Sequence, residues 1–342
     1  MYITFLIGNG FDINIGLKTR YFDFYRYFEK NANECNMIRN WIKEEKYLWS
    51  DLEMRLGQKV SAVNEKSLNQ FYQDKIELDE LLIRYLETEQ ERFRITENNK
   101  SVIEEEFVRS MKELTDGFTL VDQESIKRTK DCSRNETYEY QFITFNYTDI
   151  LNRIVDSCKK DNVDIGIHMN SVGNKVIDKI GNVFHVHGTT MGEVILGVND
   201  VTQIDNEFLR SEKNFTTTFI KEQTNRFIGQ QKTERASEII SRSQIICIFG
   251  MSLGSSDRMW WQKLVNWLLE SSSRKLVIFW KGSEKELERA IPTRTILLKN
   301  RIINNFINEG KGKHSEEEID KIQSQIIIAF NSRIFSFPEV EA

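Results

Sequence analysis

The chain has 342 residues, of which 39% are hydrophobic and 29% are charged, a composition typical of a soluble globular protein. Its net charge is only −5, so no overall basic field attracts nucleic acid, and we expect no nucleic-acid partner. No stretch reaches the roughly 18 uninterrupted apolar residues that a membrane span needs, and the four cysteines form no CxxC pair. We therefore expect a cytoplasmic protein without a membrane span, disulfide bonds or a zinc ribbon.

Seven apolar runs predict strands, and each is short, as buried parallel strands are. They cover Tyr2–Ile7, Tyr140–Phe145, Val183–Val186, Val194–Val198, Ile245–Phe249, Leu276–Trp280 and Ile326–Phe330. Helical patterns lie between several of these strands, at Phe22–Glu29, Thr148–Lys159, Phe208–Arg242 and Arg258–Ser271. Strands that alternate with helices indicate an open, mostly parallel, Rossmann-like α/β sheet.

Residues 37–130 interrupt this alternation. They are rich in Glu, Lys, Leu and Gln, contain no proline, and repeat apolar residues at helical spacing, as at Leu78 and Leu82. We predict a helical insertion over 37–130 in an α/β core formed by 1–36 and 131–342. The insertion is a candidate surface for a phage or host protein, or for homo-oligomerisation.

Two glycine-rich turns follow predicted strands. Gly8-Asn9-Gly10-Phe11-Asp12 follows the first strand, and Gly250-Met251-Ser252-Leu253-Gly254 follows the fifth. Glycine permits a tight turn and lets backbone N–H groups approach a phosphate closely, and ligands of open α/β sheets bind at the carboxyl ends of strands. We interpret both turns as candidate contacts for the phosphates and riboses of a dinucleotide. Plain glycine turns, with Asp12 as a local cap, are the alternative.

Polar side chains stand at two further strand ends. Asn146 follows the second strand, and N-capping of the next helix explains Thr148 or Asp149 but not Asn146. His185 and His187 are two residues apart and so share one face of a strand. His187, which precedes a glycine, is the better candidate for acid–base chemistry near neutral pH, and His185 suits a structural role. No carboxylate stands at a recognised ligand spacing from the pair, so no metal is expected.

These motifs, in this order, resemble the AbiH family. The residues that carry the likeness are Ile7–Asp12, Leu48–Glu53, Phe145–Asp149, His185–Gly188 and Phe249–Gly254. The resemblance extends from the first strand to about residue 260. It implies a role in abortive infection, in which an infected bacterial cell blocks phage at the cost of its own growth.

The same order is similar, more distantly, to the sirtuin-like fold that binds NAD. This likeness implies that Asn146 and Asp149 face the nicotinamide ribose and carboxamide, that His187 is the catalytic histidine, and that Gly250 and Ser252 line the phosphates and ribose. The chain departs from sirtuins because it lacks their zinc ribbon, which argues against protein deacetylation. The Leu48–Glu53 segment has no sirtuin counterpart. We expect Trp49 to pack the insertion on the sheet, and we leave the role of Glu53 open.

Together these implications predict cleavage of the nicotinamide–ribose bond of NAD during infection. Asn146 would orient water or the ribose, Asp149 would hold the carboxamide, and His187 would act as general base. The alternative is a sensor without catalytic activity, which binds a nucleotide on the sheet and recognises a phage or host protein through the insertion. A nuclease, which would need clustered acidic ligands and a basic surface patch, is least favoured, because the carboxylates are spread through helices.

Overall fold

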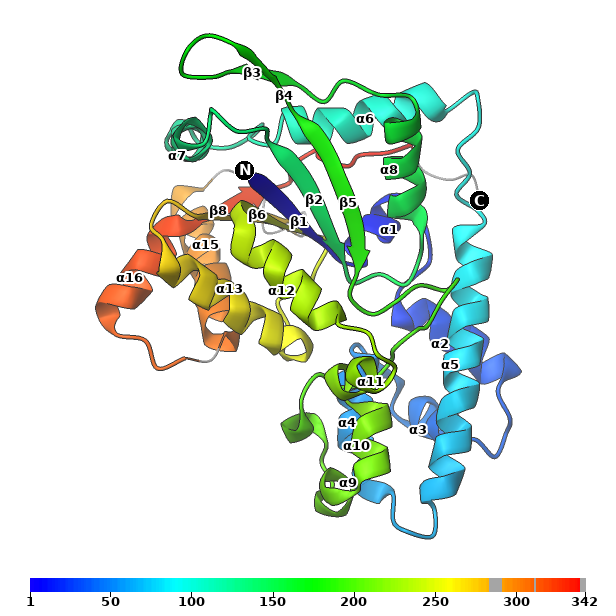
Figure 1. Cartoon of the computed structure of the whole chain (residues 1–342). Coiled ribbons are helices and arrows are strands. Elements are labelled where there is room, and N and C mark those ends of the chain that lie inside the picture. Colours follow the sequence, from blue (N-terminus) through cyan, green and yellow to red (C-terminus); the bar gives the residue numbers. More distant parts are fainter. Residues whose placement is uncertain (283–290, 311, 339–342) are drawn as a thin grey trace.

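The computed structural model describes residues 1–282, 291–310 and 312–338. Six parallel strands form one sheet in the order β5-β2-β1-β6-β7-β8 (Figure 1). They are β1 (Tyr2–Ile7), β2 (Glu139–Thr144), β5 (Lys179–His185), β6 (Ser243–Phe249), β7 (Lys275–Trp280) and β8 (Ile326–Phe330). The first strand, β1, lies in the middle of the sheet. The next two strands of the sheet, β2 and β5, extend it on one side, and β6, β7 and β8 extend it on the other. This is the doubly wound Rossmann order, so the predicted fold class is confirmed.

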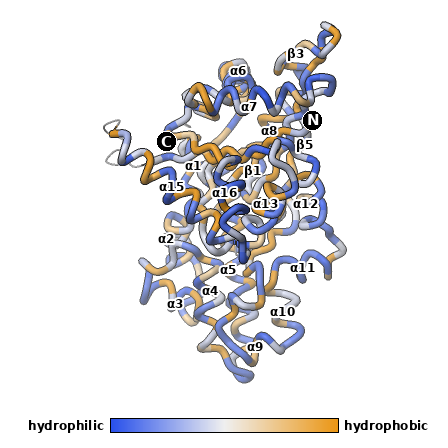
Figure 2. Tube along the Cα trace, turned by 90° about the vertical axis from the view of Figure 1, so that its left-hand side faces the viewer, coloured by the Kyte–Doolittle hydropathy of each residue, from blue (hydrophilic) through white to orange (hydrophobic). Residues whose placement is uncertain are grey.

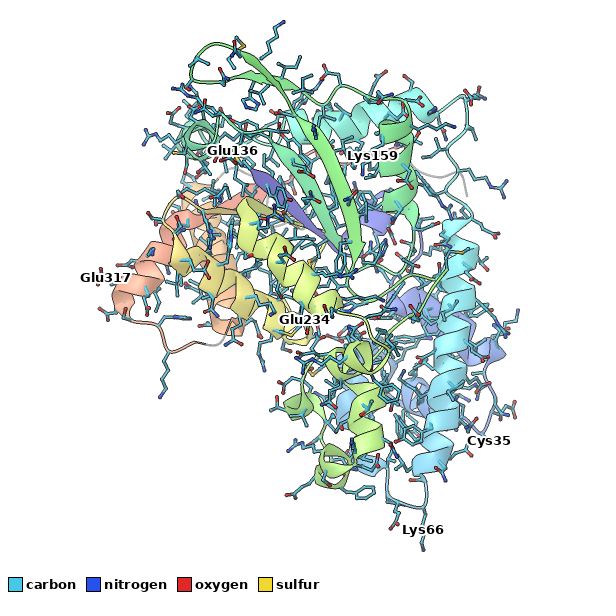
Figure 3. All side chains as sticks on the ribbon, viewed as in Figure 1. Cys35, Lys66, Glu136, Lys159, Glu234 and Glu317 are labelled. Carbon is cyan, nitrogen blue, oxygen red and sulfur yellow. The ribbon has the colours of Figure 1, made fainter. Side chains whose placement is uncertain are left out.

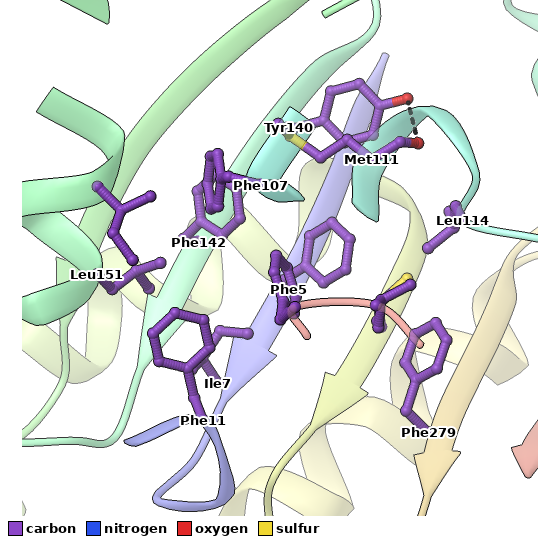
Figure 4. Close-up of a cluster of buried hydrophobic side chains, with 14 of the residues drawn as sticks. Phe5, Ile7, Phe11, Phe107, Met111, Leu114, Tyr140, Phe142, Leu151 and Phe279 are labelled. Carbon is purple, nitrogen blue, oxygen red and sulfur yellow. Dashed lines mark hydrogen bonds between the residues drawn. The ribbon is translucent and has the colours of Figure 1, made fainter. Parts of the chain in front are cut away.

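Alternate residues of each strand enter two separate hydrophobic clusters, as the period of a strand requires. On one face, Phe5 and Phe142 pack with Phe107, as Figure 4 shows. That face is covered by α1 (Gly10–Asn14), α6 (Lys100–Lys112), α7 (Leu120–Cys132) and α8 (Ile150–Lys160). The other face is covered by α12 (Lys232–Arg242), α13 (Arg258–Glu270), α15 (Pro292–Glu309) and α16 (Glu316–Gln325). Hydrophobic residues accordingly concentrate along the strands between the two helix layers, whereas hydrophilic residues are frequent on the outer helices (Figure 2).

A third hydrophobic cluster holds together what we call the helical lobe, below the sheet in Figure 1. The lobe contains α2 (Tyr21–Asn31), α3 (Met37–Glu44), α4 (Leu52–Lys59), α5 (Leu68–Gln90), α9 (Glu207–Ser211) and α10 (Lys213–Phe219), with α11 (Lys221–Phe227) beside them. Four short 3-10 turns, η1 (Lys46–Leu48), η2 (Val60–Ala62), η3 (Val201–Gln203) and η4 (Ser255–Asp257), connect its parts or border it. Segments from both halves of the chain therefore build the lobe.

Residues 37–130, the segment predicted as an insertion, contribute helices to two clusters. Its helices α3 to α5 belong to the lobe, and its last two, α6 and α7, pack on the sheet. Trp49 is fully buried in the lobe, where its carbonyl accepts a hydrogen bond from the Tyr25 hydroxyl at 2.7 Å. The division of the chain into a core and an insertion at residues 37 and 130 stays a prediction.

Three details of the predicted elements differ from the structure. Val194–Val198 is not a strand, and that prediction was wrong: the segment forms only an isolated bridge, in which the Lys221 amide donates to the Val198 carbonyl. Its apolar side chains are buried against the lobe rather than in a sheet. The predicted helical stretch Phe208–Arg242 is divided among α9 to α12. A small hairpin of β3 (Ile167–Met169) and β4 (Lys175–Ile177) was not predicted, because only three residues of each strand pair.

Charged side chains cover the outside of the molecule. Figure 3 labels several that project from well-separated elements, namely Lys66, Glu136, Lys159, Glu234 and Glu317, and all of them are exposed. Carboxylates on such faces are solvated and do not gather into a site. Within residues 1–282, 291–310 and 312–338, no helix is long and apolar enough to cross a membrane.

Candidate functional site

The carboxyl ends of the central strands lie level with one another. Ile7 pairs with Thr144 on one side and with Phe249 on the other, and Thr144 pairs with His185. The four motifs that follow these strands are therefore brought to one edge of the sheet. This edge contains the point between β1 and β6 at which the strand order reverses, where ligands of doubly wound folds bind.

A cavity of about 440 Å³ lies at this edge, between the sheet and the helical lobe. Seven of the eleven sequence-predicted site residues line it: Gly8, Asn9, Asp12, Asn146, His187, Gly250 and Ser252. The other four do not. Gly10 packs against Gly250 of the second turn. Phe11 and Leu253 are buried in the hydrophobic clusters of the two sheet faces, and Asp149 forms an ion pair outside the cavity.

The glycines of the two turns pack against each other. The amides of Gly8 and Gly10 donate to the carbonyls of Phe249 and Gly250, at 2.9 and 2.7 Å. A Cβ atom on Gly10 would lie 2.4 Å from the Gly250 Cα, so a side chain there would push the turns apart. Close contact between the turns therefore accounts for these glycines without any ligand.

The second turn has unused hydrogen-bond donors. The backbone amides of Gly250, Met251 and Ser252 donate to no group within the part of the chain that the structure describes. Amides on successive residues of a turn are a common binding site for anions. Arg20 lines the same cavity, is exposed, and forms no ion pair with a described residue. The capacity to bind phosphate thus lies at the second turn and at Arg20.

Asp12 is a buried carboxylate of the site, with 2% of its surface exposed. The Thr148 hydroxyl donates to its Oδ2 at 2.7 Å, and the Asn146 side chain also forms a hydrogen bond with it. Burial raises the pKa of Asp12 from 3.8 to about 7, and these two hydrogen bonds oppose the rise. A carboxyl with this pKa exchanges its proton near neutral pH, as general acid–base catalysis requires.

Asn146 and Asp149 belong to the loop between β2 and α8, but only Asn146 faces the cavity. Asn146 is 8% exposed, lines the cavity, and accepts a hydrogen bond on its carbonyl from His185 Nδ1 at 3.1 Å. Asp149 forms an ion pair with Arg153 at 2.8 Å, one turn further along α8, outside the cavity. The other His185 nitrogen, Nε2, lies 2.5 Å from the Asn152 side-chain amide, so both ring nitrogens contact polar groups and the ring lies outside the cavity, as in a structural histidine.

His187 is 5% exposed and lines the cavity, and its Nε2 lies 3.3 Å from the Lys221 ammonium. Lys221 in turn lies 2.5 Å from Glu53 Oε2, and the Tyr147 hydroxyl lies 3.2 Å from Glu53 Oε1. Burial lowers the pKa of His187 well below 6.5, and the charges of Lys221 and Lys232 add to this effect. The Glu53 carboxylate therefore does reach the cleft, as part of a buried network.

Sequence reasoning missed several residues of the cavity wall. Lys221, Arg20 and Tyr21 carry no strand-end signal, because they are contributed by the lobe and by the segment that leads into it. Asp257, the half-buried N-cap residue of α13, also lines the cavity, and burial raises its pKa from 3.8 to about 7. Within the described residues, no group of three or more His, Cys, Asp or Glu side chains could hold a metal ion.

The profile of a family described as "Bacteriophage abortive infection AbiH" matches residues 4–280. The chain belongs to the AbiH family. A search of curated proteins finds no match. The AbiH match contains every residue that lines the cavity, from Gly8 to Asp257, and it ends at the carboxyl end of β7, before α15. The family confirms the first of the two resemblances, and the likeness to sirtuins stays an expectation.

Proposed function

We propose that this AbiH protein binds NAD or a related adenine dinucleotide in the cavity and hydrolyses its nicotinamide–ribose bond. The observation that carries the proposal is the arrangement of Asp12, Asn146 and His187 around one cavity at the strand-order reversal. Dinucleotides bind at this point of doubly wound folds, and their scissile bond would lie among titratable side chains. Family membership supports a role in phage abortive infection.

Two groups of cavity residues suit different parts of the dinucleotide. The unused amides of Gly250–Ser252 and the Arg20 guanidinium suit the pyrophosphate, since both are donors that favour anions. Asp12 and Asn146, which line the same cavity, provide acceptors and donors for ribose hydroxyls. A volume of about 440 Å³ is within the usual range for cofactor sites.

In the reaction, the bond between ribose C1′ and the nicotinamide nitrogen breaks, and nicotinamide leaves as a neutral base with the electron pair. Water attacks the oxocarbenium-like C1′ and loses a proton, which gives ADP-ribose. We assign the proton to Asp12, because its pKa of about 7 suits a base near neutral pH. The sequence expectation gave this role to His187, but Lys221 occupies its Nε2. Asp149 has no role in the proposal, because its carboxylate is paired with Arg153 outside the cavity.

The test is the release of nicotinamide from NAD by the purified protein, alone and with extract of phage-infected cells. Asp12→Asn, Asn146→Ala and His187→Ala should each lower release by about 100-fold or more, the usual range for acid–base and positioning groups. Asp156→Asn, at an exposed carboxylate on α8, is the matched control and should retain full release. Unchanged release in all three cavity variants would reject the assignment.

A sensor without catalytic activity is the second candidate function. Tyr47 and Leu48 are 94% and 57% exposed, and they precede the cavity residue Ser50, so an apolar surface adjoins the mouth. Such a surface suits a protein partner that detects nucleotide occupancy. Tight binding of NAD without any release of nicotinamide, in both conditions of the assay, would favour this function.

A further inference from the structure

A chain of buried polar contacts extends from the helical lobe to the cavity. It connects Tyr147, Glu53, Lys221 and His187, at 3.2, 2.5 and 3.3 Å in turn. These side chains are 8%, 7%, 4% and 5% exposed, and they come from α4, from α11 and from the turns after β2 and β5. A pair so deeply buried is not one of the solvated surface ion pairs that contribute little.

The contact with Lys221 fixes which His187 nitrogen carries the proton. Lys221 donates a hydrogen bond to Glu53 Oε2 at 2.5 Å, and an ammonium group has three N–H donors and no lone pair. The ring nitrogen that faces it, Nε2, must therefore accept. The proton of the neutral imidazole is then on Nδ1, which is sealed from solvent and has no acceptor among the described residues.

The surroundings keep this ring uncharged. Two cations face His187, Lys221 from α11 and Lys232 from α12, and together with burial they lower its pKa well below 6.5. The rings of Phe145 and Tyr147 pack on it with centroids 5.5 and 6.3 Å away. The only carboxylate in the chain of contacts, Glu53, reaches His187 through Lys221.

We propose that Lys221, anchored by Glu53, is a positioning residue that holds His187 as the Nδ1–H tautomer. Ligand binding then opens Nδ1 to the cavity, and His187 donates a hydrogen bond from Nδ1 to an acceptor oxygen of the ligand without removing a proton. This inference rests on the proposed function for the identity of that ligand, whose carboxamide and ribose hydroxyls supply acceptor oxygens. A buried donor without a partner is unfavourable until such an oxygen arrives, so the contact selects ligands that carry one.

The tautomer can be measured without any activity. Long-range ¹H–¹⁵N spectra of histidine-labelled protein separate protonated from unprotonated ring nitrogens, and the chain has only four histidines. The His187 signals are those that disappear in His187→Asn. At pH 7 we expect a protonated Nδ1 and an unprotonated Nε2. A protonated Nε2, or a charged ring, would overturn the inference.

Variants separate the effect of the Lys221–His187 hydrogen bond from the effect of a nearby positive charge. Lys221→Met removes both and should allow the proton to populate Nε2. Lys232→Met is the matched control, because it removes a cation that faces His187 without a hydrogen bond to the ring, and the Nδ1–H form should persist. If Lys221→Met alone does not fold because Glu53 loses its partner, Glu53→Gln with Lys221→Met replaces the pair by neutral groups. A His187 tautomer that is the same in these variants as in the wild type would overturn the role of Lys221.

Kinetics complete the test. The double variant should lower kcat for nicotinamide release by roughly 10- to 100-fold, the cost of leaving a buried acceptor oxygen without its donor, whereas Lys232→Met should change it by only a few fold. Addition of NAD to the wild type should shift the Nδ1 signal as the acceptor oxygen arrives. Absence of nicotinamide release in the wild type would reject the proposed function, and the tautomer result would stand independently. A double variant with wild-type kcat would reject the positioning role.

Discussion

At the residue scale, Asp12 makes a prediction about stability. Its pKa rises from 3.8 to about 7 on folding, so between these values the folded chain holds a proton that the unfolded chain has released. The free energy of unfolding must therefore fall as pH rises through this window, by roughly 1.4 kcal/mol per pH unit and ~4 kcal/mol at most.

Asp12→Asn should remove this contribution, since the amide does not titrate. We expect the loss of stability between pH 4 and pH 8 to be smaller in the variant than in the wild type, measured by urea unfolding at each pH. Asp257→Asn is the comparison, because the pKa of Asp257 is also about 7. In the wild type, both carboxyls therefore contribute to the fall of the unfolding free energy with pH. Identical pH profiles for Asp12→Asn and the wild type would show that Asp12 is not buried as described.

The same residue shapes the pH dependence of activity. If Asp12 accepts the proton of the attacking water, kcat/KM should rise with pH and level off above an apparent pKa of about 7. In Asp12→Asn the residual rate should lack this rise. A rise at the same pH in the variant would assign the base to another group of the cavity wall, such as Asp257.

The two glycine turns can be tested against a matched glycine. Gly250 and Gly117 both have left-handed backbones, with φ of 69° and 78°, so alanine is strained at either position. A Cβ on Gly250 would lie 2.7 Å from the Phe11 nitrogen, whereas one on Gly117 would meet nothing within 4 Å. Gly250→Ala should therefore cost about 1–3 kcal/mol more than Gly117→Ala in urea unfolding, from overpacking. Equal costs would mean that the turns do not rely on their close contact.

At the element scale, helices on one face of the sheet hold the second turn. The Trp261 indole on α13 donates to the Gly254 carbonyl at 2.8 Å, and the Asn305 amide on α15 donates to the Leu253 carbonyl at 3.0 Å. These bonds secure the residues that follow the unused amides of Gly250–Ser252. Packing of α13 on the sheet is thus connected to the geometry of the candidate phosphate site.

Trp261→Phe should weaken dinucleotide binding as well as stability. Trp267→Phe is the control, since its indole donates to the Ser243 carbonyl at 3.0 Å, at the opposite end of β6. Each change should cost about 1–3 kcal/mol of stability through a lost buried hydrogen bond. Only Trp261→Phe should raise the Kd for NAD in calorimetry. An equal rise in both variants would show that the turn needs no support from α13.

The elements also show what the sequence could and could not predict. Six of seven predicted strands are present, because buried parallel strands are short apolar runs that stand out from helices. Val194–Val198 has the same apolar pattern, but its partners are lobe helices, and composition alone cannot distinguish the two surroundings. The strand-end rule found Asp12, Asn146 and His187 because register fixes where strands end. It could not find Lys221, whose partner Glu53 is 168 residues away in sequence.

At the scale of the whole molecule, the cavity lies between the α/β sheet and the helical lobe. The sheet side contributes the turns after β1, β2, β5 and β6, and the lobe contributes Glu53 from α4 and Leu82 and Leu86 from α5. Lys221 and Glu53 form an ion pair beside this junction. A ligand in the cavity would therefore contact both bodies at once, and its binding energy would oppose their separation.

Ligand binding should accordingly stabilise the two bodies together. Hydrogen exchange with and without NAD should show slower exchange in α4 and α11 as well as in the turns at Gly8–Asp12 and Gly250–Gly254, because a group must open before its amide exchanges. Saturation at 100 times Kd should add about 2.7 kcal/mol to the free energy of unfolding, which a thermal melt detects as a higher Tm. The Asn146→Ala variant, which weakens the site, is the control and should lose both effects together. Protection confined to the turns, with α4 and α11 unchanged, would place the ligand on the sheet alone and remove the lobe from the site.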